Sequence, residues 1–393
     1  MSAAAGPDGL RAEIVEDAGA LAAVAGDWDA LAEANGWALA APAWLLAWWR
    51  NCAPSGARLR VVVVRDPEGA VVGLAPFAAL VSGGVTVYRP LGSGMAIRSG
   101  PLAAPGHEVP VARAIAAALA GARPRPGEIH LEQVDEDSPW PLLLTRAWPG
   151  VLPPRRELDH TAPAPTLRLT AASYEEWLAG KSSNFRQRLR RDARKLPEGG
   201  AVTRLAATPE ELEWALGEFD RLHGEKWGDE SPLASAAGAR MMLEAGRDLL
   251  ASGRFRAYWI EVEGRAITVQ IFVAAGGEVV YWNGGWDTEW SSLTPALQCI
   301  CSGVEDAFGR GERRVDFGQG EHHYKTRLAD GDDPIAWFRI SPRGLAYPRT
   351  LLLTLPRRAR GVARSALDHA PARVRARIDR LRGRSAEPPA EDG

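Results

Sequence analysis

Short apolar runs separated by turn residues dominate the middle of the first half of the chain. Three of them, at 58–65, 71–80 and 85–91, follow one another with Asp-Pro-Glu-Gly and Gly-Gly turns between them. Apolar runs of this length between turn signals predict β-strands, so we expect a meander of three strands. An alanine-rich helical pattern at 109–122 and a short strand pattern at 128–132 follow the meander. This part of the chain therefore predicts a mixed α/β unit.

A tryptophan-rich helical pattern precedes the meander. Pro42 suits the first turn of a helix, and Trp44, Trp48 and Trp49 follow it at a spacing of i, i+4 and i+5. This spacing places the three indoles on one apolar stripe, which predicts a helix packed against a sheet.

The second half of the chain repeats this order of patterns. Three strand patterns with glycine-containing turns between them recur at 254–262, 266–275 and 278–284. A helical pattern that begins at Pro295 and a strand pattern at 313–317 follow them. The repetition predicts an α/β fold with mixed sheets, built from two tandem units of the same architecture.

Changes in composition divide the chain further. We expect an N-terminal domain at 10–160 and a second domain at 165–345, with the proline- and charge-rich stretch 153–165 as a linker. The arginine-rich stretch 346–384 has an amphipathic helical pattern, and the tail 385–393 is expected to be disordered. A basic amphipathic stretch of this kind can lie against the inner membrane surface or against a partner such as a synthase complex.

The overall composition excludes several classes of protein. The 393 residues carry a formal net charge of −2, so no global field attracts DNA. Apolar stretches fall short of the roughly 18 residues of a membrane span, and the N-terminus lacks a secretory signal pattern. Cys52, Cys299 and Cys301 cannot form a disulfide framework, and the last two are expected to be small buried residues and not a metal clip. We therefore expect a cytoplasmic protein without a bound metal.

Asp316 is the first candidate for chemistry. It ends a predicted strand, where a carboxylate emerges at the rim of a sheet. There it could orient an acceptor amine or act as a general base. It could equally cap the loop formed by Gly318, Gln319 and Gly320.

A run of basic residues is the second candidate. Arg186, Arg190 and Arg194 lie at i, i+4 and i+8 of a helical pattern, so they form one stripe. A solvated basic face is the usual meaning of such a run. Binding of phosphate groups or of a carrier molecule is the functional alternative.

Two longer strings carry a resemblance to a known family. They are SSNFRQRLRRDARKL at 182–196 and RVDFGQGEHHYKTRL at 314–328. With the tryptophan-rich opening, they resemble the branch of GNAT acyltransferases that includes CelD-like cellulose-biosynthesis proteins and BioF-type acetyltransferase domains. That branch is similar to the FemABX peptidoglycan transferases, which also carry two tandem GNAT-like units. The resemblance implies acyl transfer from a thioester, or aminoacyl transfer from charged tRNA, to an amine or hydroxyl.

The resemblance also implies where an acyl-CoA donor such as acetyl-CoA would bind. In the GNAT fold two neighbouring strands part, and the donor's pyrophosphate rests on the amides at the start of the next helix. Here that helix begins at Pro295, with Thr294 as its expected N-cap. The expected donor-binding residues are Ser291, Ser292, Thr294, Gly284, Arg186 and Arg190. The glycine-rich phosphate loop of ordinary GNAT enzymes is absent before Pro295, which leaves the identity of the donor open.

Catalytic roles follow from the same resemblance. Lys325 corresponds to the lysine that Fem-type enzymes associate with the acyl donor and the developing oxyanion, and a solvated surface lysine is the alternative. Tyr324 could protonate the departing thiolate, a role that a tyrosine often has in GNAT enzymes, or it could be a packing residue. Asp316 completes the expected catalytic set, and Trp282, Trp286, Gln319 and His323 are expected to contact the acceptor. For Trp282 and Trp286, packing in the core or at its rim is the alternative.

Three functions fit these features. The first is an acyl-CoA-dependent N- or O-acyltransferase acting on a small amine, sugar or nucleotide-sugar intermediate of envelope or polysaccharide biosynthesis. The second is a Fem-like transferase that uses aminoacyl-tRNA. The third is a non-catalytic accessory protein of polysaccharide synthesis. Release of free CoA, sensitivity to RNase and tolerance of changes at Lys325 and Asp316 would distinguish them.

Overall fold

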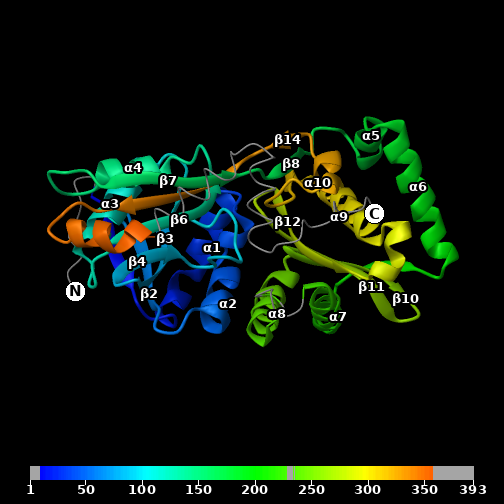
Figure 1. Ribbon diagram of the computed structural model, residues 1–393, viewed down its shortest axis with the longest axis horizontal. Helices are drawn as coiled ribbons and strands as arrows, with labels where there is room; N and C mark the ends of the chain where they lie inside the picture. Colours follow the sequence, from blue (N-terminus) through cyan, green and yellow to red (C-terminus); the bar gives the residue numbers. More distant parts are fainter. Residues whose placement is uncertain (1–8, 228–232, 234, 357–393) are drawn as a thin grey trace.

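The computed structural model describes residues 9–227, 233 and 235–356. Figure 1 shows two α/β halves side by side, each with a mixed sheet. The predicted α/β class with two tandem units is confirmed. Both meanders form as expected, since β2, β3 and β4 are antiparallel neighbours in the first sheet and β10, β11 and β12 in the second.

The first sheet has the strand order β1-β2-β3-β4-β6-β15-β7, with β5 paired to β3. Its strands are β1 Arg11–Val15, β2 Arg58–Arg65, β3 Val71–Ser82, β4 Val85–Pro90, β5 Leu102–Ala103, β6 Glu128–Asp135, β7 Arg155–Ala162 and β15 Ile335–Ser341. One face carries α1 and α2 and the other α3 and α4 (Figure 1). These helices are α1 Ala25–Ala34, α2 Pro42–Cys52, α3 Glu108–Gly121 and α4 Trp140–Ala147, with the 3₁₀ turns η1 Ala20–Val24 and η2 Ala38–Ala40 beside α1 and α2.

The second sheet has the order β14-β8-β13-β12-β11-β10-β9. Its strands are β8 Pro165–Arg168, β9 Val202–Leu205, β10 Phe255–Val262, β11 Arg265–Ala275, β12 Glu278–Trp286, β13 Arg314–Asp316 and β14 Gly331–Asp332. Helices α7 and α8 cover the face turned toward the first half, and α9 covers the opposite face with α5 and α6 beyond it (Figure 1). The helices are α5 Tyr174–Ala179, α6 Ser183–Glu198, α7 Pro209–Trp227, α8 Ala236–Leu250, α9 Pro295–Gly309 and α10 His323–Leu328, with the 3₁₀ turn η5 Thr288–Leu293 before α9.

The division between the two halves differs from our prediction. The interpretation of 153–165 as a linker is wrong, because β7 fills most of it and pairs with β15 at the edge of the first sheet. Strand β15, which we placed in the second domain, lies between β6 and β7 in the first. Most side chains of β7 are exposed and many are charged, so this strand lacks the apolar run that marked the others.

A continuous apolar core joins the halves. Trp44 of α2 and Trp282 of β12 meet edge to face, with ring centroids 4.8 Å apart. Both indole Nε1 groups donate to the carbonyl of Met95, at 3.1 and 3.0 Å. One cluster of buried apolar residues therefore contains side chains from both sheets.

The described part of the C-terminal region is a helix at 347–356. It places Thr350 and Thr354 inward and leaves Leu352 and Leu355 exposed. The rest of the predicted basic extension at 346–384, and the tail at 385–393, lie outside the described residues. Among the helices that the structure describes, none combines the length and the apolarity needed to cross a membrane.

The cysteines behave as small apolar residues. Cys299 and Cys301 of α9 are buried free thiols, as predicted, and Cys52 is a half-buried one. Burial raises the pKa of the Cys301 thiol to about 12, so it stays protonated near neutral pH. Within the described ranges, no group of three or more His, Cys, Asp or Glu side chains is arranged to hold a metal ion.

Candidate active site

Strands β12 and β13 part at the centre of the second sheet. They run parallel and pair from Glu278 with Arg314 as far as Val280 with Asp316. The chain beyond Asp316 then turns away from β12, since the amide of Phe317 donates to Pro165 and that of Gly320 to Pro163. Strand β12 runs on to Trp286, and over the described residues it has no strand partner on this side. The predicted parting of the two strands is confirmed.

A β-bulge at this point separates two neighbouring aromatic side chains. Phe272 of β11 pairs with Tyr281 and Ile271 with Asn283, so Trp282 is the extra residue of β12. Tyr281 belongs to the cluster beneath α9, whereas Trp282 packs into the core between the two halves. As neighbours on one strand, the two rings point to opposite faces of the sheet, one toward α9 and α10 and the other toward the first half.

A chain of buried hydrogen bonds begins at Tyr281. Its hydroxyl donates to Oε1 of Gln270 at 2.7 Å, and Nε2 of Gln270 donates to Oγ1 of Thr268 at 2.7 Å. The Thr268 hydroxyl in turn donates to the carbonyl of Gly285 at 2.9 Å. Because a carbonyl only accepts, this last bond sets the direction of the whole chain and the orientation of the Gln270 amide.

Tyr324 of α10 extends this chain to the place where the strands part. Its ring lies edge to face with that of Tyr281, with ring centroids 6.5 Å apart, and the two hydroxyls are hydrogen-bonded. Since the single proton of Tyr281 points to Gln270, Tyr324 is the donor of the pair. Burial raises the pKa of Tyr324 to about 12, so it is a protonated acid at neutral pH.

Gly284 has a structural role in this chain. A Cβ on Gly284 would lie 1.9 Å from Oε1 of Gln270, which crosses over this position from the neighbouring strand. Any larger residue would push the Gln270 amide out of line. We predicted Gly284 as a donor-binding residue, and in the structure it leaves the room that Gln270 occupies.

Lys325 lies beneath the loop that follows β13. Its side chain is buried, and Nζ donates to the carbonyls of Gln319 at 2.7 Å and Gly318 at 3.3 Å. Burial lowers the pKa of Lys325 to about 8, against the opposite effect of the nearby Asp316 carboxylate. The role of Lys325 at an oxyanion stays a prediction, whereas its hydrogen bonds to the loop are seen in the structure.

The pKa of Lys325 gives a prediction about stability. Its folded-state pKa of about 8 lies below its unfolded value of 10.5, so between these values the unfolded state binds more protons. Stability from this group therefore rises with pH across that window. We expect the unfolding free energy of the wild type, minus that of Lys325→Met, to increase by a few kcal/mol from about pH 8 to about pH 10. Urea unfolding of both proteins at several pH values measures this difference, and a flat difference would contradict the prediction.

Asp316 is fully engaged in structural contacts. Its Oδ2 accepts from Nε of Arg98 at 2.9 Å, and its Oδ1 accepts from the amide of Gly318 at 2.7 Å. Only 2% of the residue is exposed. Of our two interpretations, this geometry fits the cap of the 318–320 loop better than the general base, since both oxygens already have partners.

The start of α9 differs from our expectation. Thr294 does not cap the helix, because its backbone is left-handed with φ 46° and its hydroxyl donates to Oδ2 of Asp192 at 3.2 Å. Asp192 is a fully buried residue of α6, and α6 also accepts a bond from Gln298 of α9 at the carbonyl of Leu189. A carboxylate from α6 therefore lies at the helix start that we expected to be open to the donor's phosphates.

The other two residues predicted at this helix start lie in the turn before it. The Ser291 hydroxyl donates to the carbonyl of Thr288, and Ser292 is exposed.

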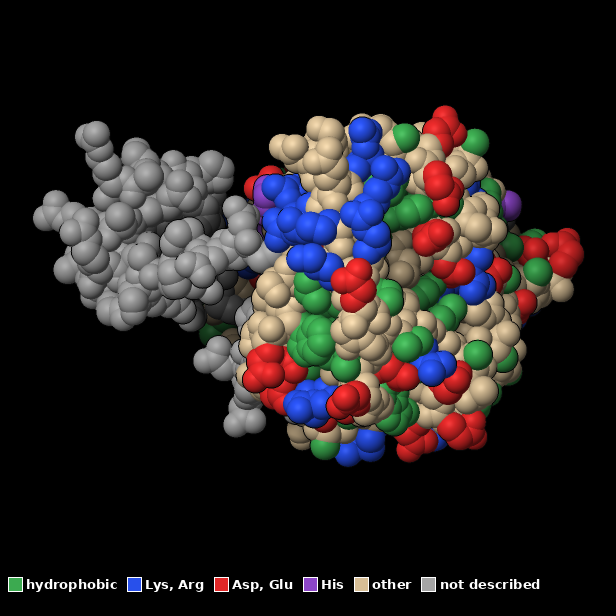
Figure 2. Space-filling view, turned by 90° about the vertical axis from the view of Figure 1, so that its right-hand side faces the viewer, with side chains coloured by type: hydrophobic (Ala, Val, Ile, Leu, Met, Phe, Trp, Pro, Cys, Tyr) green, Lys and Arg blue, Asp and Glu red, His purple; other side chains and the backbone are tan. Residues whose placement is uncertain are grey.

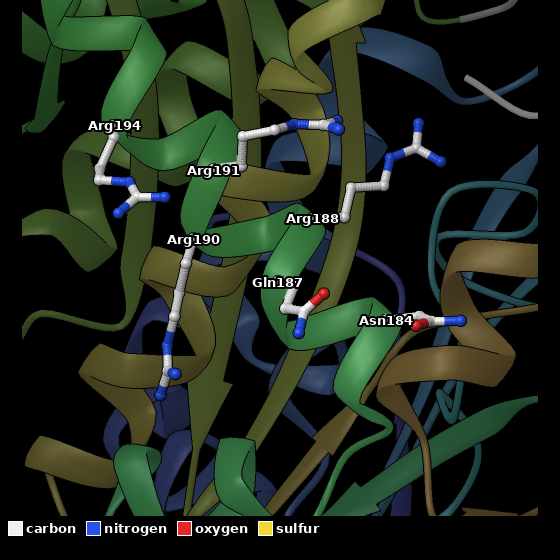
Figure 3. A pocket seen from close by; sticks show the side chains of 6 residues that line it. All are labelled: Asn184, Gln187, Arg188, Arg190, Arg191 and Arg194. Carbon is white, nitrogen blue, oxygen red and sulfur yellow. The ribbon is translucent and has the colours of Figure 1, made fainter.

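The outer face of α6 carries a hollow. About 560 Å³ in volume, it is lined by Asn184, Gln187, Arg188, Arg190, Arg191 and Arg194. All six belong to one helix, so this is an open groove on the surface. Figure 3 shows Arg188 and Arg191 extending to one side of α6, and Arg190 and Arg194 to the other. Figure 2, which faces this end of the molecule, shows Lys and Arg side chains gathered on its upper part.

Arg186 does not belong to this basic face. Its guanidinium donates to the carbonyls of Ala179 and Lys181, so it closes the end of α5. The regular spacing at i, i+4 and i+8 could not show this, because the carbonyls that hold Arg186 come from the preceding turn. Of the two arginines predicted for the donor, only Arg190 is exposed in the groove.

The predicted acceptor residues do not gather in one place. Trp282 is part of the core between the halves, through its bond to Met95 and its contact with Trp44. Gln319 and His323 are exposed around the loop after β13, and Trp286 is half-buried at the end of β12. Their contact with an acceptor stays a prediction.

Residues 183–326 match the family model described as an acetyltransferase (GNAT) domain. This segment is a GNAT-type acyltransferase domain. The matched segment runs from α6 to α10 and so contains the parted strands and the whole hydrogen-bond chain of this GNAT domain.

Solved structures share the fold of this chain across both halves. The crystal structure of FemX has 12% sequence identity, covers 84% of this chain and 98% of its own, and gives a TM-score of 0.58. The structure of L-PGS from Bacillus licheniformis has 13% sequence identity, covers 84% of this chain and 95% of its own, and gives a TM-score of 0.51. The structure of a conserved protein of unknown function from Bacteroides thetaiotaomicron has 10% sequence identity, covers 82% of this chain and 97% of its own, and gives a TM-score of 0.52. No curated protein matches the chain by sequence.

Sequence reasoning missed the inner members of the site. Gln270 and Thr268 lie two apart on β11, which places them on one face of the sheet. Two polar side chains inside an otherwise apolar strand are a signal that could have been noticed. Asp192 gave no such signal, because an acid among many basic residues of a helix is usually a solvated surface residue.

Proposed function

We propose that this GNAT-type protein transfers the acyl group of an acyl-CoA to an amine or hydroxyl of a small acceptor. The acceptor would be an amine, a sugar or a nucleotide-sugar intermediate of envelope or polysaccharide biosynthesis. One observation carries the proposal: β12 continues alone past the end of β13, and the Tyr324 hydroxyl ends a directed hydrogen-bond chain beside this edge.

The chemistry assigned to the site is nucleophilic substitution at a thioester. The acceptor's nitrogen or oxygen forms a bond to the thioester carbonyl carbon and the C–S bond breaks. The Tyr324 hydroxyl turns its proton from the Tyr281 oxygen to the departing thiolate and donates it. The acceptor's proton passes to solvent, from which the tyrosinate regains one. The hydrogen bond to Tyr281 holds the phenol in one orientation, and Gln270 and Thr268 fix Tyr281 in turn.

The donor's phosphates have a different expected position from that in ordinary GNAT enzymes. The start of α9 already faces the Asp192 carboxylate, which would repel a pyrophosphate. Arg191 pairs with Asp192 through Nε and a terminal nitrogen. Nε of Arg188 lies 3.8 Å from Oδ2 of Asp192. We assign phosphate recognition to the arginines of the α6 groove, whose planar forks suit phosphate oxygens.

Tyr324→Phe tests the proposed general acid. We expect kcat for acyl-CoA consumption to fall by about 10²-fold or more, with a smaller change in the donor KM, because only the proton donor is removed. Gln270→Leu leaves the acid in place without its support, so we expect a smaller loss of kcat. The rate of free CoA thiol release with a panel of amines and sugars measures both.

Tyr174→Phe is the matched control for this prediction. Tyr174 is also a largely buried tyrosine of the second half, but it is hydrogen-bonded to Cys301 on α9, away from the edge of β12. It should keep wild-type kcat. Full activity of Tyr324→Phe would contradict the role of this residue, and no CoA release with any donor would contradict the proposed function itself.

The open basic groove of α6 favours a second candidate, transfer of an aminoacyl group from charged tRNA. An open, positively charged helix face suits a nucleic-acid backbone as well as it suits the phosphates of CoA. Incubation with charged tRNA and RNase separates the two functions. Transfer that RNase abolishes supports the tRNA donor, and transfer from acyl-CoA that RNase leaves unchanged supports the first proposal.

A further inference from the structure

A second pocket lies where the first half of the molecule meets the start of α8. Its volume is about 290 Å³, and its walls come from α2, β3, β4, the loop after β4 and residues 235–237. Most of its lining is apolar and includes Trp48, Pro54, Leu80, Pro90 and Met95. Arg89 and Ser93 are the main polar members on the side of the first sheet.

The polar side of this pocket lies where two parallel strands of the first sheet part. Strands β4 and β6 pair only at Val87 with Glu128 and at Tyr88 with Ile129. Arg89 follows the last paired residue of β4, and Glu132 lies beyond the last paired residue of β6. This is the same topological position in the first unit as the parting of β12 and β13 in the second.

Arg89 is held in place from behind by a buried carboxylate. Its Nε donates to Oε1 of Glu132 at 2.7 Å, and the Ser93 hydroxyl donates to the other oxygen at 2.5 Å. Nδ1 of His130 lies 3.5 Å from Oε1 of the same carboxylate. Burial would raise the pKa of Glu132, but the hydrogen bonds from His130, Arg89 and Ser93 outweigh it and lower the pKa to about 2. Glu132 is therefore a permanent anion that orients the arginine.

Toward the described residues, the terminal nitrogens of Arg89 remain available. Among the described residues Glu132 is its partner, and it uses only Nε. The side chain is 41% exposed, in contrast to the 11% of Glu132 behind it. A guanidinium held by Nε presents its two NH₂ groups as a planar fork, which matches a carboxylate or a phosphate.

This pocket is separate from the Tyr324 site. Its wall residue Met95 contacts Trp282, whose ring lies on the face of the second sheet opposite to Tyr281. The hydrogen-bond chain from Tyr324 to Thr268 contributes no residue to its lining. A ligand here would touch the core between the two halves without occupying the edge of β12.

We propose that this pocket binds a small acid, a carboxylate- or phosphate-bearing molecule with a compact apolar part, through the fork of Arg89. The apolar part lies against Trp48, Leu80 and Met95, and the acidic group pairs with the two free NH₂ groups. The inference does not depend on the proposed acyl transfer, because it concerns binding in the first unit.

Calorimetric titration of the whole protein with benzoate and with phenyl phosphate tests the proposal, with benzyl alcohol as the neutral probe. We expect saturable binding of at least one of the two acids and none of benzyl alcohol. Which acid binds identifies carboxylate or phosphate as the recognised group. Arg89→Gln should weaken that binding at least tenfold, because it removes the charge and the fork.

Two further variants keep the test informative. Leu80→Trp fills the apolar part of the pocket and should also abolish binding, provided that urea unfolding shows it to be folded. Arg58→Gln, at an exposed arginine on β2 of the same sheet, should bind like the wild type. Absence of saturable binding of either acid, or binding that neither Arg89→Gln nor Leu80→Trp weakens, would overturn the proposal. Because no acyl donor is present, the outcome is independent of the activity assays.

Discussion

Arg98→Met should lower the free energy of unfolding by about 3–5 kcal/mol. Arg98 lies in the first half of the chain, and its side chain is 3% exposed. Its Nε donates to Asp316 of the second half at 2.9 Å, a terminal nitrogen pairs with Asp135, and another donates to the carbonyl of Asp333 at 3.1 Å. Removing the guanidinium leaves the Asp316 carboxylate buried without its counter-charge, and this penalty is the main part of the expected loss.

Urea unfolding measures this loss, and two further variants interpret it. Asp316→Asn in the Arg98→Met background removes the unpaired charge, so it should recover part of the stability. Arg247→Met breaks a pair with Glu213 in which both side chains are at least half exposed, and should cost less than about 1 kcal/mol. A loss at Arg98 as small as that at Arg247 would show that the buried pair does not hold the halves together.

Gly276→Ala is the second substitution with a large expected effect. Gly276 lies in the turn between β11 and β12, with φ +55°, and a Cβ there would lie 1.9 Å from the carbonyl oxygen of Glu33. That oxygen belongs to the backbone of α1 in the other half, so it cannot rotate away like a side chain. The hairpin must move back from α1, which also disturbs the pairing of Arg254 with Asp29 and Glu33. We expect a loss of about 3 kcal/mol or more.

Gly264→Ala separates the clash from the backbone strain. Gly264 occupies the preceding hairpin turn with φ +79°, and nothing lies within 4 Å of its missing Cβ. Its substitution carries only the cost of a left-handed backbone, about 1 kcal/mol. Thermal and urea unfolding of both variants give the comparison. Equal losses would show that the contact between the turn and α1 does not matter for stability.

These two predictions concern the surface between the halves, which sequence reasoning did not see. The turn glycines were recognised as turn residues, but nothing near Gly276 in the sequence indicates that Glu33 lies against it. Arg98 follows a glycine-rich loop and has no pattern around it that indicates a buried ion pair. Its partners Asp135, Asp316 and Asp333 come from three distant segments, and only folding brings them together.

Local patterns determined a large part of the architecture by themselves. Alternation and turn chemistry are properties of adjacent residues, so both meanders and the helices after them could be read from the chain. The strings at 182–196 and 314–328 likewise indicated the GNAT family, which the match over 183–326 confirms. The parting of β12 and β13 followed from that resemblance.

Tertiary structure alone decided which of the candidate residues form a site. Asp192 reaches the start of α9 because α6 crosses it, and Gln270 reaches Tyr281 because a bulge and Gly284 make room for it. Strand β15 returns to the first sheet, which no local pattern predicts. The physical reason is the same in each case: the contact joins residues far apart in the chain, and its energy depends on burial and geometry that exist only after folding.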